Sequence, residues 1–324
     1  MRVLVIGGTH FVGRHTVEVL LEAGHQVSVL NRGVSADPLP PTVQRLRADR
    51  TQRDEVLAAL DGRSFDAVVD CPGYRPENLR IMIERFRGRV GCYVFISTCS
   101  AYAPSERLPI DESFPLWDDS PRDYPRNKVA CERLLEAAGR DQGFPWVALR
   151  PAYIYGRYNN VPQAELALIG RIERGEPVRI PGDGSFFFHP CHARDLARAA
   201  LAAIERKRAS HRAYTINGAY AYTANGFVAA LREAVGRDFP VEHAPAVTTR
   251  AEAASFFYFA GAPSAAYSIE RARRELEWEP RSDLVAGLRD TYRWYVDSDY
   301  ARRPTPARVS NAQPGGDLPT PYTD

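Results

Sequence analysis

The chain has 324 residues, of which 44% are hydrophobic and 25% charged; these values exclude wholesale disorder and fit one large α/β unit or two modest domains. The formal net charge is +2 and no block of like charge stands out, which argues against a nucleic-acid-binding or membrane-surface protein. No apolar run approaches the roughly 18 residues that a membrane helix needs.

The first half of the chain alternates strand-like and helix-like segments. We predict strands at residues 3–6, 27–30, 44–47, 67–70, 93–97 and 146–149, and helices at residues 12–23, 54–60, 77–86 and 124–138. Gly24 ends the first helix, because glycine readily takes up the left-handed conformation found after helices. Strands that alternate with helices in this way form a parallel sheet covered on both faces. The predicted fold is therefore a doubly wound α/β (Rossmann) sheet.

After Arg150 and Pro151 the composition changes, and glycine, proline and aromatic residues become frequent. We predict helices at residues 163–174, 195–206, 224–235, 269–276 and 283–295. The expected organisation is a dinucleotide-binding domain at 1–155, a smaller C-terminal substrate lobe at 156–302 that is partly interleaved with the sheet, and an irregular tail at 303–324.

Residues 7–13 follow the first predicted strand and open the first helix, which is the context that a dinucleotide-binding turn requires. Gly7 would allow a tight turn, Gly13 would let the helix pack close to the strand, and the helix N-terminus would face the pyrophosphate. The spacing departs from G-x-G-x-x-G, and an ordinary strand-to-helix turn is the alternative. The predicted cofactor-binding residues here are Gly7, Gly8, Thr9, His10, Phe11, Val12 and Gly13.

The second predicted strand leads into Asn31 and Arg32, where an NAD site usually carries Asp or Glu for the ribose diol. Asparagine still bonds a hydroxyl but does not repel a phosphate, and Arg32 can pair with a 2′-phosphate in bidentate fashion. This pair favours NADP over NAD. The alternative is a solvated loop arginine, which is common in a chain whose only lysines are Lys128 and Lys207.

Tyr124 and Lys128 are four residues apart, so both lie on one face of the predicted helix 124–138. A nearby ammonium favours the ionised form of a phenol, which suits a tyrosine for proton transfer near neutral pH. An ordinary surface pair is the alternative. The strand before this helix ends in the hydroxyl-rich residues 97–102, at the edge of a parallel sheet where ligands bind.

As a set, these motifs resemble the extended short-chain dehydrogenase/reductase superfamily, in its nucleotide-sugar epimerase/dehydratase branch, over about residues 1–298. The marks are the glycine turn, the hydroxyl-rich strand end and the Tyr124/Lys128 pair. Further marks are Leu-Arg-Pro at 149–151 before Tyr-Gly at 155–156, Pro-Gly-Asp-Gly at 181–184, Arg-Asp-Leu-Ala at 194–197 and Arg-Arg-Glu-Leu-Glu-Trp-Glu-Pro at 273–280.

The resemblance implies roles for individual residues. Tyr124 would be the catalytic acid and base, and Lys128 would hold the nicotinamide ribose. Thr98 lies four residues before Tyr102, which matches the tyrosine of the family's V-Y-G element, so Thr98 would hydrogen-bond the reacting oxygen. Asp49 matches the family's adenine-contacting Asp, and Pro151 is counted with the cofactor-binding residues.

Two departures from the family pattern limit which of the family's reactions the protein is expected to catalyse. The family's dehydratases and decarboxylases carry a carboxylate where this chain has Ser100, so the sequence disfavours dehydration and decarboxylation. Cys99 directly precedes Ser100, so in an extended segment its side chain should point to the opposite face. We expect it to have a packing role. The stretch 185–192 is aromatic and lacks the arginine usual in diphosphate-sugar binders; it could stack a base or ring, or form a buried strand. The predicted substrate residues are Ser100, Tyr153, Phe188 and His189.

The function that this sequence favours is NAD(P)-dependent hydride transfer at a carbinol or ketone carbon of a sugar-type substrate, in a nucleotide-sugar epimerase. An NADPH-dependent ketoreductase is the alternative, and a non-catalytic dinucleotide-sensing or nucleic-acid-binding relative is an alternative of another class. The cofactor would be NAD or NADP. We expect a small-molecule, sugar-linked substrate and no nucleic acid or membrane partner, and leave a homodimer open.

The five cysteines, an odd number without metal-ligand spacing, are expected to be reduced thiols of a cytoplasmic protein. The apolar run at the start of the chain is too short for a signal peptide. His189 and His192 are spaced by three residues, but we expect no metal site there because no third ligand is near in the sequence. We expect His192 to cap or pack beside Asp195.

Overall fold

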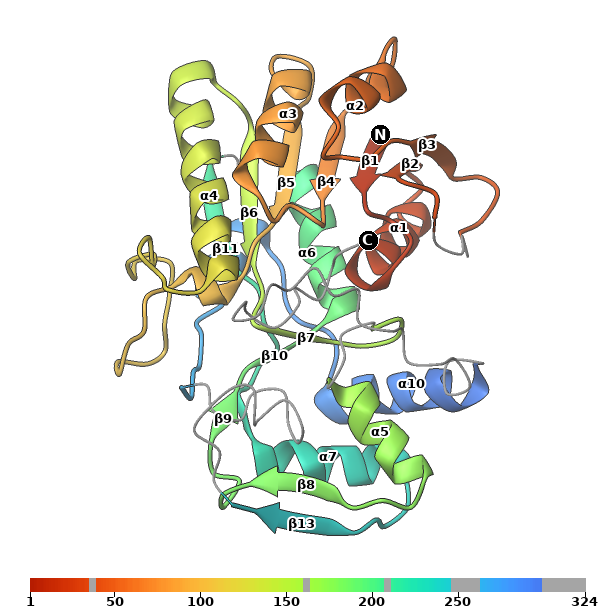
Figure 1. Cartoon of the computed structure of the whole chain (residues 1–324), viewed down its shortest axis with the longest axis vertical. Coiled ribbons are helices and arrows are strands. Elements are labelled where there is room, and N and C mark those ends of the chain that lie inside the picture. Colours follow the sequence, from red (N-terminus) through yellow and green to blue (C-terminus); the bar gives the residue numbers. More distant parts are fainter. Residues whose placement is uncertain (35–38, 160–163, 207–210, 246–262, 299–324) are drawn as a thin grey trace.

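The computed structural model describes residues 1–34, 39–159, 164–206, 211–245 and 263–298 (Figure 1). Strands and helices alternate through the first half of the chain, as predicted. These elements are β1 (Arg2–Ile6), α1 (Phe11–Glu22), β2 (Gln26–Asn31), β3 (Gln44–Arg47), α2 (Arg53–Leu60), β4 (Ala67–Asp70), α3 (Pro76–Phe86), β5 (Cys92–Ile96), the 3-10 turn η1 (Cys99–Ala101), α4 (Asp123–Gln142) and β6 (Trp146–Arg150).

The second half of the described chain contains shorter strands between its helices. They are β7 (Tyr153–Tyr155), α5 (Glu165–Glu173), β8 (Val178–Pro181), β9 (Phe187–Phe188), β10 (Pro190–His192), α6 (Ala193–Glu205), β11 (Arg212–Thr215), β12 (Tyr222–Thr223), α7 (Ala224–Val235), β13 (Val241–Ala244), α9 (Glu270–Leu276) and α10 (Leu284–Asp297). The tail predicted at residues 303–324 lies outside the described residues.

The central sheet has seven strands in the order β11-β6-β5-β4-β1-β2-β3, and every neighbouring pair is parallel. The chain order reverses between β1 and β4, which is the arrangement of a doubly wound dinucleotide-binding sheet. The predicted fold class is therefore confirmed. In Figure 1 the carboxyl ends of these strands point toward the second lobe.

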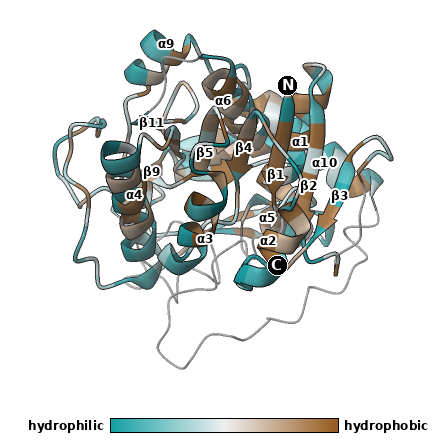
Figure 2. Cartoon of the chain, turned by 90° about the horizontal axis from the view of Figure 1, so that it is seen from above, coloured by the Kyte–Doolittle hydropathy of each residue, from teal (hydrophilic) through white to brown (hydrophobic). Residues whose placement is uncertain are grey.

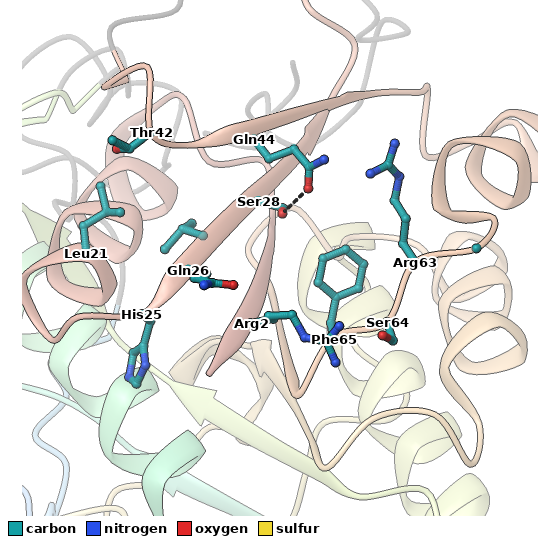
Figure 3. Close-up of a pocket in the computed structure, with 12 residues that line it drawn as sticks. Arg2, Leu21, His25, Gln26, Ser28, Thr42, Gln44, Arg63, Ser64 and Phe65 are labelled. Atoms are coloured by element: carbon teal, nitrogen blue, oxygen red, sulfur yellow. Dashed lines mark hydrogen bonds between the residues drawn. The ribbon is translucent and has the colours of Figure 1, made fainter.

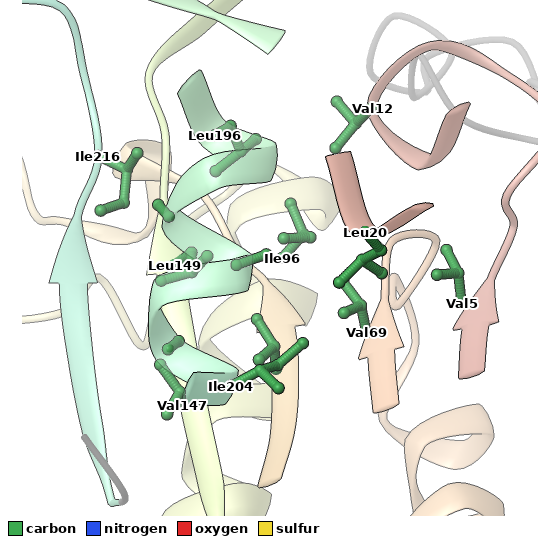
Figure 4. Packing of buried hydrophobic residues seen from close by; sticks show 14 of the residues in the cluster. Val5, Val12, Leu20, Val69, Ile96, Val147, Leu149, Leu196, Ile204 and Ile216 are labelled. Atoms are coloured by element: carbon green, nitrogen blue, oxygen red, sulfur yellow. The ribbon is translucent and has the colours of Figure 1, made fainter. Parts of the chain in front are cut away.

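The apolar strands are buried because helices cover both faces of the sheet. Alternate residues go to opposite faces: Val3 and Val5 join the core beneath α1 and α6, while Leu4 and Ile6 join the core beneath α2, α3 and α4. Figure 4 shows the first of these cores, where Leu20 of α1 packs near strand residues. Each fully buried side chain of this size stabilises the fold by about 1.5–3 kcal/mol.

The outward faces of the helices are polar, as expected for a sheet protein with helices in the outer layers. Figure 2 shows hydrophobic colour along β1, β4 and β5 and hydrophilic colour on the outer surfaces of α3, α4 and α9. No helix among the described residues is long and apolar enough to cross a membrane.

Helix α4 is longer than the sequence pattern predicts. We predicted its end at residue 138, before Gly139, but it continues to Gln142 and stops at Gly143, whose φ is +64°. Gly139 stays inside the helix because the ring of Trp146 packs against it; a Cβ there would lie 2.6 Å from Trp146 Nε1. The glycine therefore serves close packing on β6 and does not end the helix.

The second lobe has its own apolar core, formed mainly by α5, α7, α10 and β8. The chain does not divide cleanly at one residue, since β11 is the edge strand of the central sheet and α6 packs against α1 and β5. The expected interleaving is thus present, while the exact domain limits stay a prediction.

Candidate active site

The glycine turn between β1 and α1 is built for close backbone approach. Gly7 has φ +75°, which favours glycine, and its N–H donates to the Leu30 carbonyl at 3.0 Å. A Cβ on Gly13 would lie 1.9 Å from the Gly7 carbonyl oxygen, so a larger residue cannot occupy that position without moving the turn. Both structural roles predicted for Gly7 and Gly13 are confirmed, and their cofactor role stays a prediction.

The start of α1 fits the pyrophosphate of a dinucleotide. His10 is the N-cap residue and its side chain makes no capping hydrogen bond, so the first backbone N–H groups of the helix are not capped by it. Phe11, Val12 and Thr9 bury their side chains, so they would meet a ligand through the backbone. Phe11 has φ +32°, a strained conformation of the kind that clusters at ligand-binding turns.

Two arginines, Arg32 and Arg47, lie at the ends of β2 and β3, and only Arg32 was predicted from the sequence. Asn31 pairs with Arg47 in the register of these strands, and its side-chain oxygen accepts a hydrogen bond from Gly33 N at 3.0 Å. A Cβ on Gly33 would lie 2.9 Å from Arg47 Nε, so the Arg47 side chain lies beside this loop. Both Arg32 and Arg47 are exposed. Arg47 could have been found from its place at the end of the neighbouring strand.

Asp49 follows β3, as expected for a residue near the adenine. Its carboxylate accepts hydrogen bonds from Thr51 N and Thr51 Oγ1, both at 2.8 Å. The backbone hydrogen bond from Thr51 lowers the pKa of Asp49, and the positive charge of Arg32 contributes in the same direction. Asp49 is therefore an anchored carboxylate close to Arg32.

Tyr124 and Lys128 lie in the first turns of α4, beyond the carboxyl end of β5. The Lys128 ammonium donates a hydrogen bond of 2.6 Å to the Ile96 carbonyl and lies 4.6 Å from the centre of the Tyr74 ring. Burial lowers the pKa of Lys128 to about 8. Tyr124 is half-buried, with its ring centre 6.2 Å from that of Tyr74. The two side chains therefore lie together at the edge of the sheet where ligands bind in this fold.

Thr98 follows β5 at the same edge. Its side-chain oxygen caps η1 by accepting a hydrogen bond from Ser100 N at 3.1 Å. Ser100 is half-buried, and Pro151 is buried with its carbonyl accepting from Cys99 N at 2.8 Å. The Cys99 thiol donates to the Arg150 carbonyl at 3.1 Å, and burial raises the pKa of Cys99. Cys99 thus packs in the interior, as predicted.

A buried ion pair holds the strand ends beneath these residues. Arg150 at the end of β6 bonds the Glu132 carboxylate of α4 through Nε, at 3.0 and 3.1 Å, and through a second nitrogen at 2.5 Å. The Ser97 hydroxyl donates to the same carboxylate. Breaking a buried pair of this kind costs about 3–5 kcal/mol, so it fixes α4 on the sheet.

The predicted substrate residues of the second lobe have packing roles in this structure. Tyr153 is buried and its hydroxyl donates to Glu165 at 2.6 Å, while Phe188 lies in the core of the lobe. The two ring nitrogens of His189 lie 2.8 Å from the Gly218 carbonyl and 3.1 Å from Tyr267 N. These contacts do not support a substrate role for the three residues. That role stays a prediction.

His192 packs beneath the glycine of the Tyr-Gly motif. Its ring centre is 5.1 Å from that of Tyr155 and 6.1 Å from that of His15. As the N-cap residue of α6 it makes no side-chain capping bond, so the capping role that we considered is wrong and the packing role is right. Among the described residues, no group of three or more His, Cys, Asp or Glu side chains is arranged to hold a metal ion.

A cavity of about 580 Å³ lies at the other edge of the sheet, near the amino ends of β1, β2 and β3. Arg2, Ser28, Gln44, Arg63 and Phe65 are among its lining residues, and Ser28 donates to Gln44 across it (Figure 3). The cavity is therefore separate from the edge that carries the glycine turn, Thr98 and Tyr124.

The comparisons with known proteins agree with this architecture. A family model described as the NAD dependent epimerase/dehydratase family matches residues 3–217. The chain is 30% identical over 311 residues to the chloroplast stem-loop binding protein of 41 kDa b of Arabidopsis thaliana, covering 90% of this chain and 78% of that protein. It is 24% identical over 334 residues to a UDP-glucose 4-epimerase of Lacticaseibacillus casei, covering 91% of this chain and 97% of that protein.

A solved structure extends the likeness to three dimensions. The UDP-glucose 4-epimerase of Thermotoga maritima, determined with UDP-glucose, aligns with a TM-score of 0.78 at 22% identity over 92% of this chain and 99% of the other. At this identity the likeness supports the fold.

Proposed function

The chain belongs to the NAD dependent epimerase/dehydratase family, an NAD(P)-dependent branch of the extended short-chain dehydrogenases/reductases, and from this we propose that it epimerises a hydroxyl-bearing carbon of a nucleotide sugar. The observation that carries the proposal is the grouping of Thr98, Tyr124 and Lys128 at the carboxyl edge of the sheet. This grouping can move a proton to and from a carbinol oxygen, which is the protein's part in such a reaction.

In the proposed mechanism, Tyr124 in its phenolate form takes the proton of the sugar hydroxyl, and the resulting phenol later returns that proton. Thr98 hydrogen-bonds the same oxygen and holds it toward Tyr124. Lys128 is fixed by its bond to Ile96 and contributes positive charge beside the phenol. The glycine turn and the start of α1 would hold the dinucleotide, whose nicotinamide supplies the hydride acceptor and donor.

The residues near Thr98 support an epimerase over a dehydratase. Ser100 occupies the place where family dehydratases carry a carboxylate, and Cys99 is buried with its thiol bonded to a backbone carbonyl. Neither group can supply the acid that water elimination needs. Reversible oxidation and reduction of a hydroxyl needs no such acid.

The proposed cofactor is NADP, although the family as a whole is described as NAD dependent. Arg32 and Arg47 are exposed side chains at the ends of β2 and β3, where the 2′-phosphate of an adenosine would lie. Asn31 brings no negative charge that would repel that phosphate. A homodimer and a cytoplasmic location stay predictions.

The test of the reaction uses purified full-length protein. Mass spectrometry of freshly purified material identifies any bound dinucleotide, because an epimerase must keep its cofactor between its two half-reactions. The protein is then mixed with UDP- and dTDP-hexoses and with their 4-keto forms, while the absorbance of reduced nicotinamide is followed and products are resolved by NMR.

An epimerase interconverts two hydroxyl sugars with no net absorbance change. Stoichiometric loss of added NADPH with a keto substrate, and no epimerised product from any hydroxyl sugar, would instead identify a ketoreductase. That alternative is favoured by the two exposed arginines, which suit an exchangeable NADPH.

A second candidate function is stem-loop binding, and the observation that favours it is the similarity to the Arabidopsis stem-loop binding protein. The near-zero net charge disfavours it, since nucleic-acid binding depends on neutralising phosphates. Fluorescence anisotropy with a labelled stem-loop RNA at increasing salt separates the two functions. Salt-dependent binding in the micromolar range or tighter, together with no turnover of any sugar, would replace the epimerase proposal.

A further inference from the structure

Tyr74 is an aromatic residue of the predicted active site to which the proposed mechanism gives no role. It lies between β4 and α3, shortly before Pro76 begins that helix. The Lys128 nitrogen is 4.6 Å from the centre of the Tyr74 ring, and the ring centres of Tyr74 and Tyr124 are 6.2 Å apart. Tyr74 therefore lies against both members of the tyrosine–lysine pair, although it comes from a different part of the chain.

Two close contacts fix the backbone that carries Tyr74. A Cβ on Gly7 would lie 2.9 Å from Cδ and Cγ of Pro72, so Pro72 packs directly on the glycine turn. A Cβ on Gly73 would lie 2.4 Å from Phe95 Cε2, so Gly73 lets the segment pack closely on β5. Residues 72–74 therefore connect the predicted dinucleotide turn to the active-site lysine.

Aromatic rings surround the Lys128 ammonium. Its nitrogen lies 4.8 Å from the centre of the Phe95 ring and 6.0 Å from that of Tyr124, in addition to its contact with Tyr74. A cation within about 6 Å of a ring centre is attracted to the face of the ring. Phe95 is fully buried in β5 and Tyr124 belongs to α4, so of these three rings Tyr74 is the one that a loop supplies.

These rings offset part of the cost of burying a charge. Lys128 is 1% exposed, and burial lowers its pKa to about 8. Attraction to the ring faces favours the ammonium form and restricts its movement. A lysine that is already held in place can bind a ribose hydroxyl without first being ordered, which is how preorganisation strengthens binding.

We propose that Tyr74 is a positioning residue, whose ring holds the Lys128 ammonium in the place from which it binds the nicotinamide ribose and acts on Tyr124. The proposal rests on the proposed function, because that function gives Lys128 its role. The ring does this and the hydroxyl does not, so phenylalanine should replace Tyr74 without loss and leucine should not.

A double-mutant cycle between Tyr74 and Lys128 tests the proposal, because it measures whether the two residues act through each other. Calorimetry gives the dissociation constants of NADP and NAD for the full-length protein, Tyr74→Leu, Lys128→Met and the double variant. Tyr74→Leu should weaken binding by about 2–30-fold, the range expected from the loss of one cation–π contact. In the Lys128→Met background the same substitution should have almost no effect, since the ammonium is gone.

Two further variants complete the cycle. Tyr74→Phe keeps the ring and should bind both dinucleotides as the unsubstituted protein does. Phe239→Leu is the matched control, because Phe239 lies under the Arg232 guanidinium, 5.0 Å from its ring centre, in the second lobe. It should leave both dissociation constants unchanged. Equal losses from Tyr74→Leu with and without Lys128, or a loss in Tyr74→Phe as large as in Tyr74→Leu, would overturn the proposal.

An NMR measurement needs neither cofactor nor sugar. The chain contains only two lysines, so in a Lys207→Arg background protein grown with lysine labelled at the ε carbon with ¹³C gives a single lysine signal. Ring currents should shift the ε protons of Lys128 upfield, and Tyr74→Leu should remove part of that shift. If the ε protons of the protein with Tyr74 in place resonate where those of an exposed lysine do, the proposal is overturned, even where Tyr74→Leu fails to fold. Neither measurement contains a sugar, so failure to epimerise any sugar would overturn the proposed function alone.

Discussion

Tyr124 and Lys128 lie one turn apart on α4, and the Lys128 ammonium is 6.0 Å from the centre of the Tyr124 ring. The ammonium is buried and bonded to Ile96, the last residue of β5, whereas the phenol is half-exposed. The hydrogen bond to β5 therefore fixes the lysine against the sheet, whereas the tyrosine remains accessible to a ligand. This difference predicts different consequences when each residue is replaced.

Tyr124→Phe should lower turnover by about 10²–10⁴-fold, the usual contribution of a positioned acid or base. The ring is retained, so the fold and the dinucleotide affinity should not change. Steady-state kinetics, circular dichroism and titration with NADP check these outcomes. Near-normal turnover in a folded Tyr124→Phe protein would show that another group transfers the proton.

Lys128→Met should abolish turnover and also weaken dinucleotide binding by about 1.5–3 kcal/mol, since a charged hydrogen-bond donor to the ribose is lost. The loss of binding distinguishes it from Tyr124→Phe. Isothermal titration calorimetry measures the affinity, and Lys207→Met, which removes the other lysine, is the control. Equal NADP affinity in Lys128→Met and in the control would contradict the ribose role.

Arg32→Ala and Arg47→Ala should each weaken NADP binding by about 1.5–3 kcal/mol and leave NAD binding almost unchanged, because only NADP carries the 2′-phosphate. Affinities for both cofactors are measured by calorimetry. Arg53→Ala, which removes an exposed arginine from α2, is the control. Equal losses for the two cofactors, or a native preference for NAD, would rule out the phosphate role.

Gly13→Ala should destabilise the protein by about 1–3 kcal/mol or more and remove dinucleotide binding, since the new Cβ would lie 1.9 Å from the Gly7 carbonyl oxygen. Gly226→Ala is a suitable control because Gly226 is also helical and its nearest neighbour is the Thr223 side chain at 3.2 Å. It should change stability by no more than about 1 kcal/mol. Chemical denaturation measures both variants, and equal effects would refute the steric argument.

The protein should lose stability as the pH falls below about 6.5, the ordinary pKa of histidine. Burial lowers the pKa of His15 and of His192, so between the folded and unfolded values the unfolded state binds protons that the native state does not. Each histidine should then lower the free energy of unfolding by up to about 1.4 kcal/mol per pH unit. His192→Leu should reduce this slope in denaturation curves at pH 7.5 and 5. An unchanged slope would exclude His192 as a source.

The fold was largely predictable from the sequence because it depends on local patterns. Apolar runs bounded by glycine and proline located the strands and helices of the first half in their observed order. The turn from Gly7 to Gly13 and the spacing of Tyr124 and Lys128 were likewise visible, since each lies within a few residues of chain. The end of α4 was missed because Gly139 serves packing against a distant tryptophan, which local sequence does not reveal.

What only the tertiary structure decided is which distant side chains meet. Arg50 lies in the loop after β3 and Asp70 ends β4, and nothing in their spacing along the chain indicates that the two side chains meet. A parallel sheet joins its strands through helices, so residues tens of positions apart come together at one edge only when the strand order is known. The sequence by itself therefore determined the elements, the glycine turn and the tyrosine–lysine pair, whereas the order of the strands decided the charged partners beneath them.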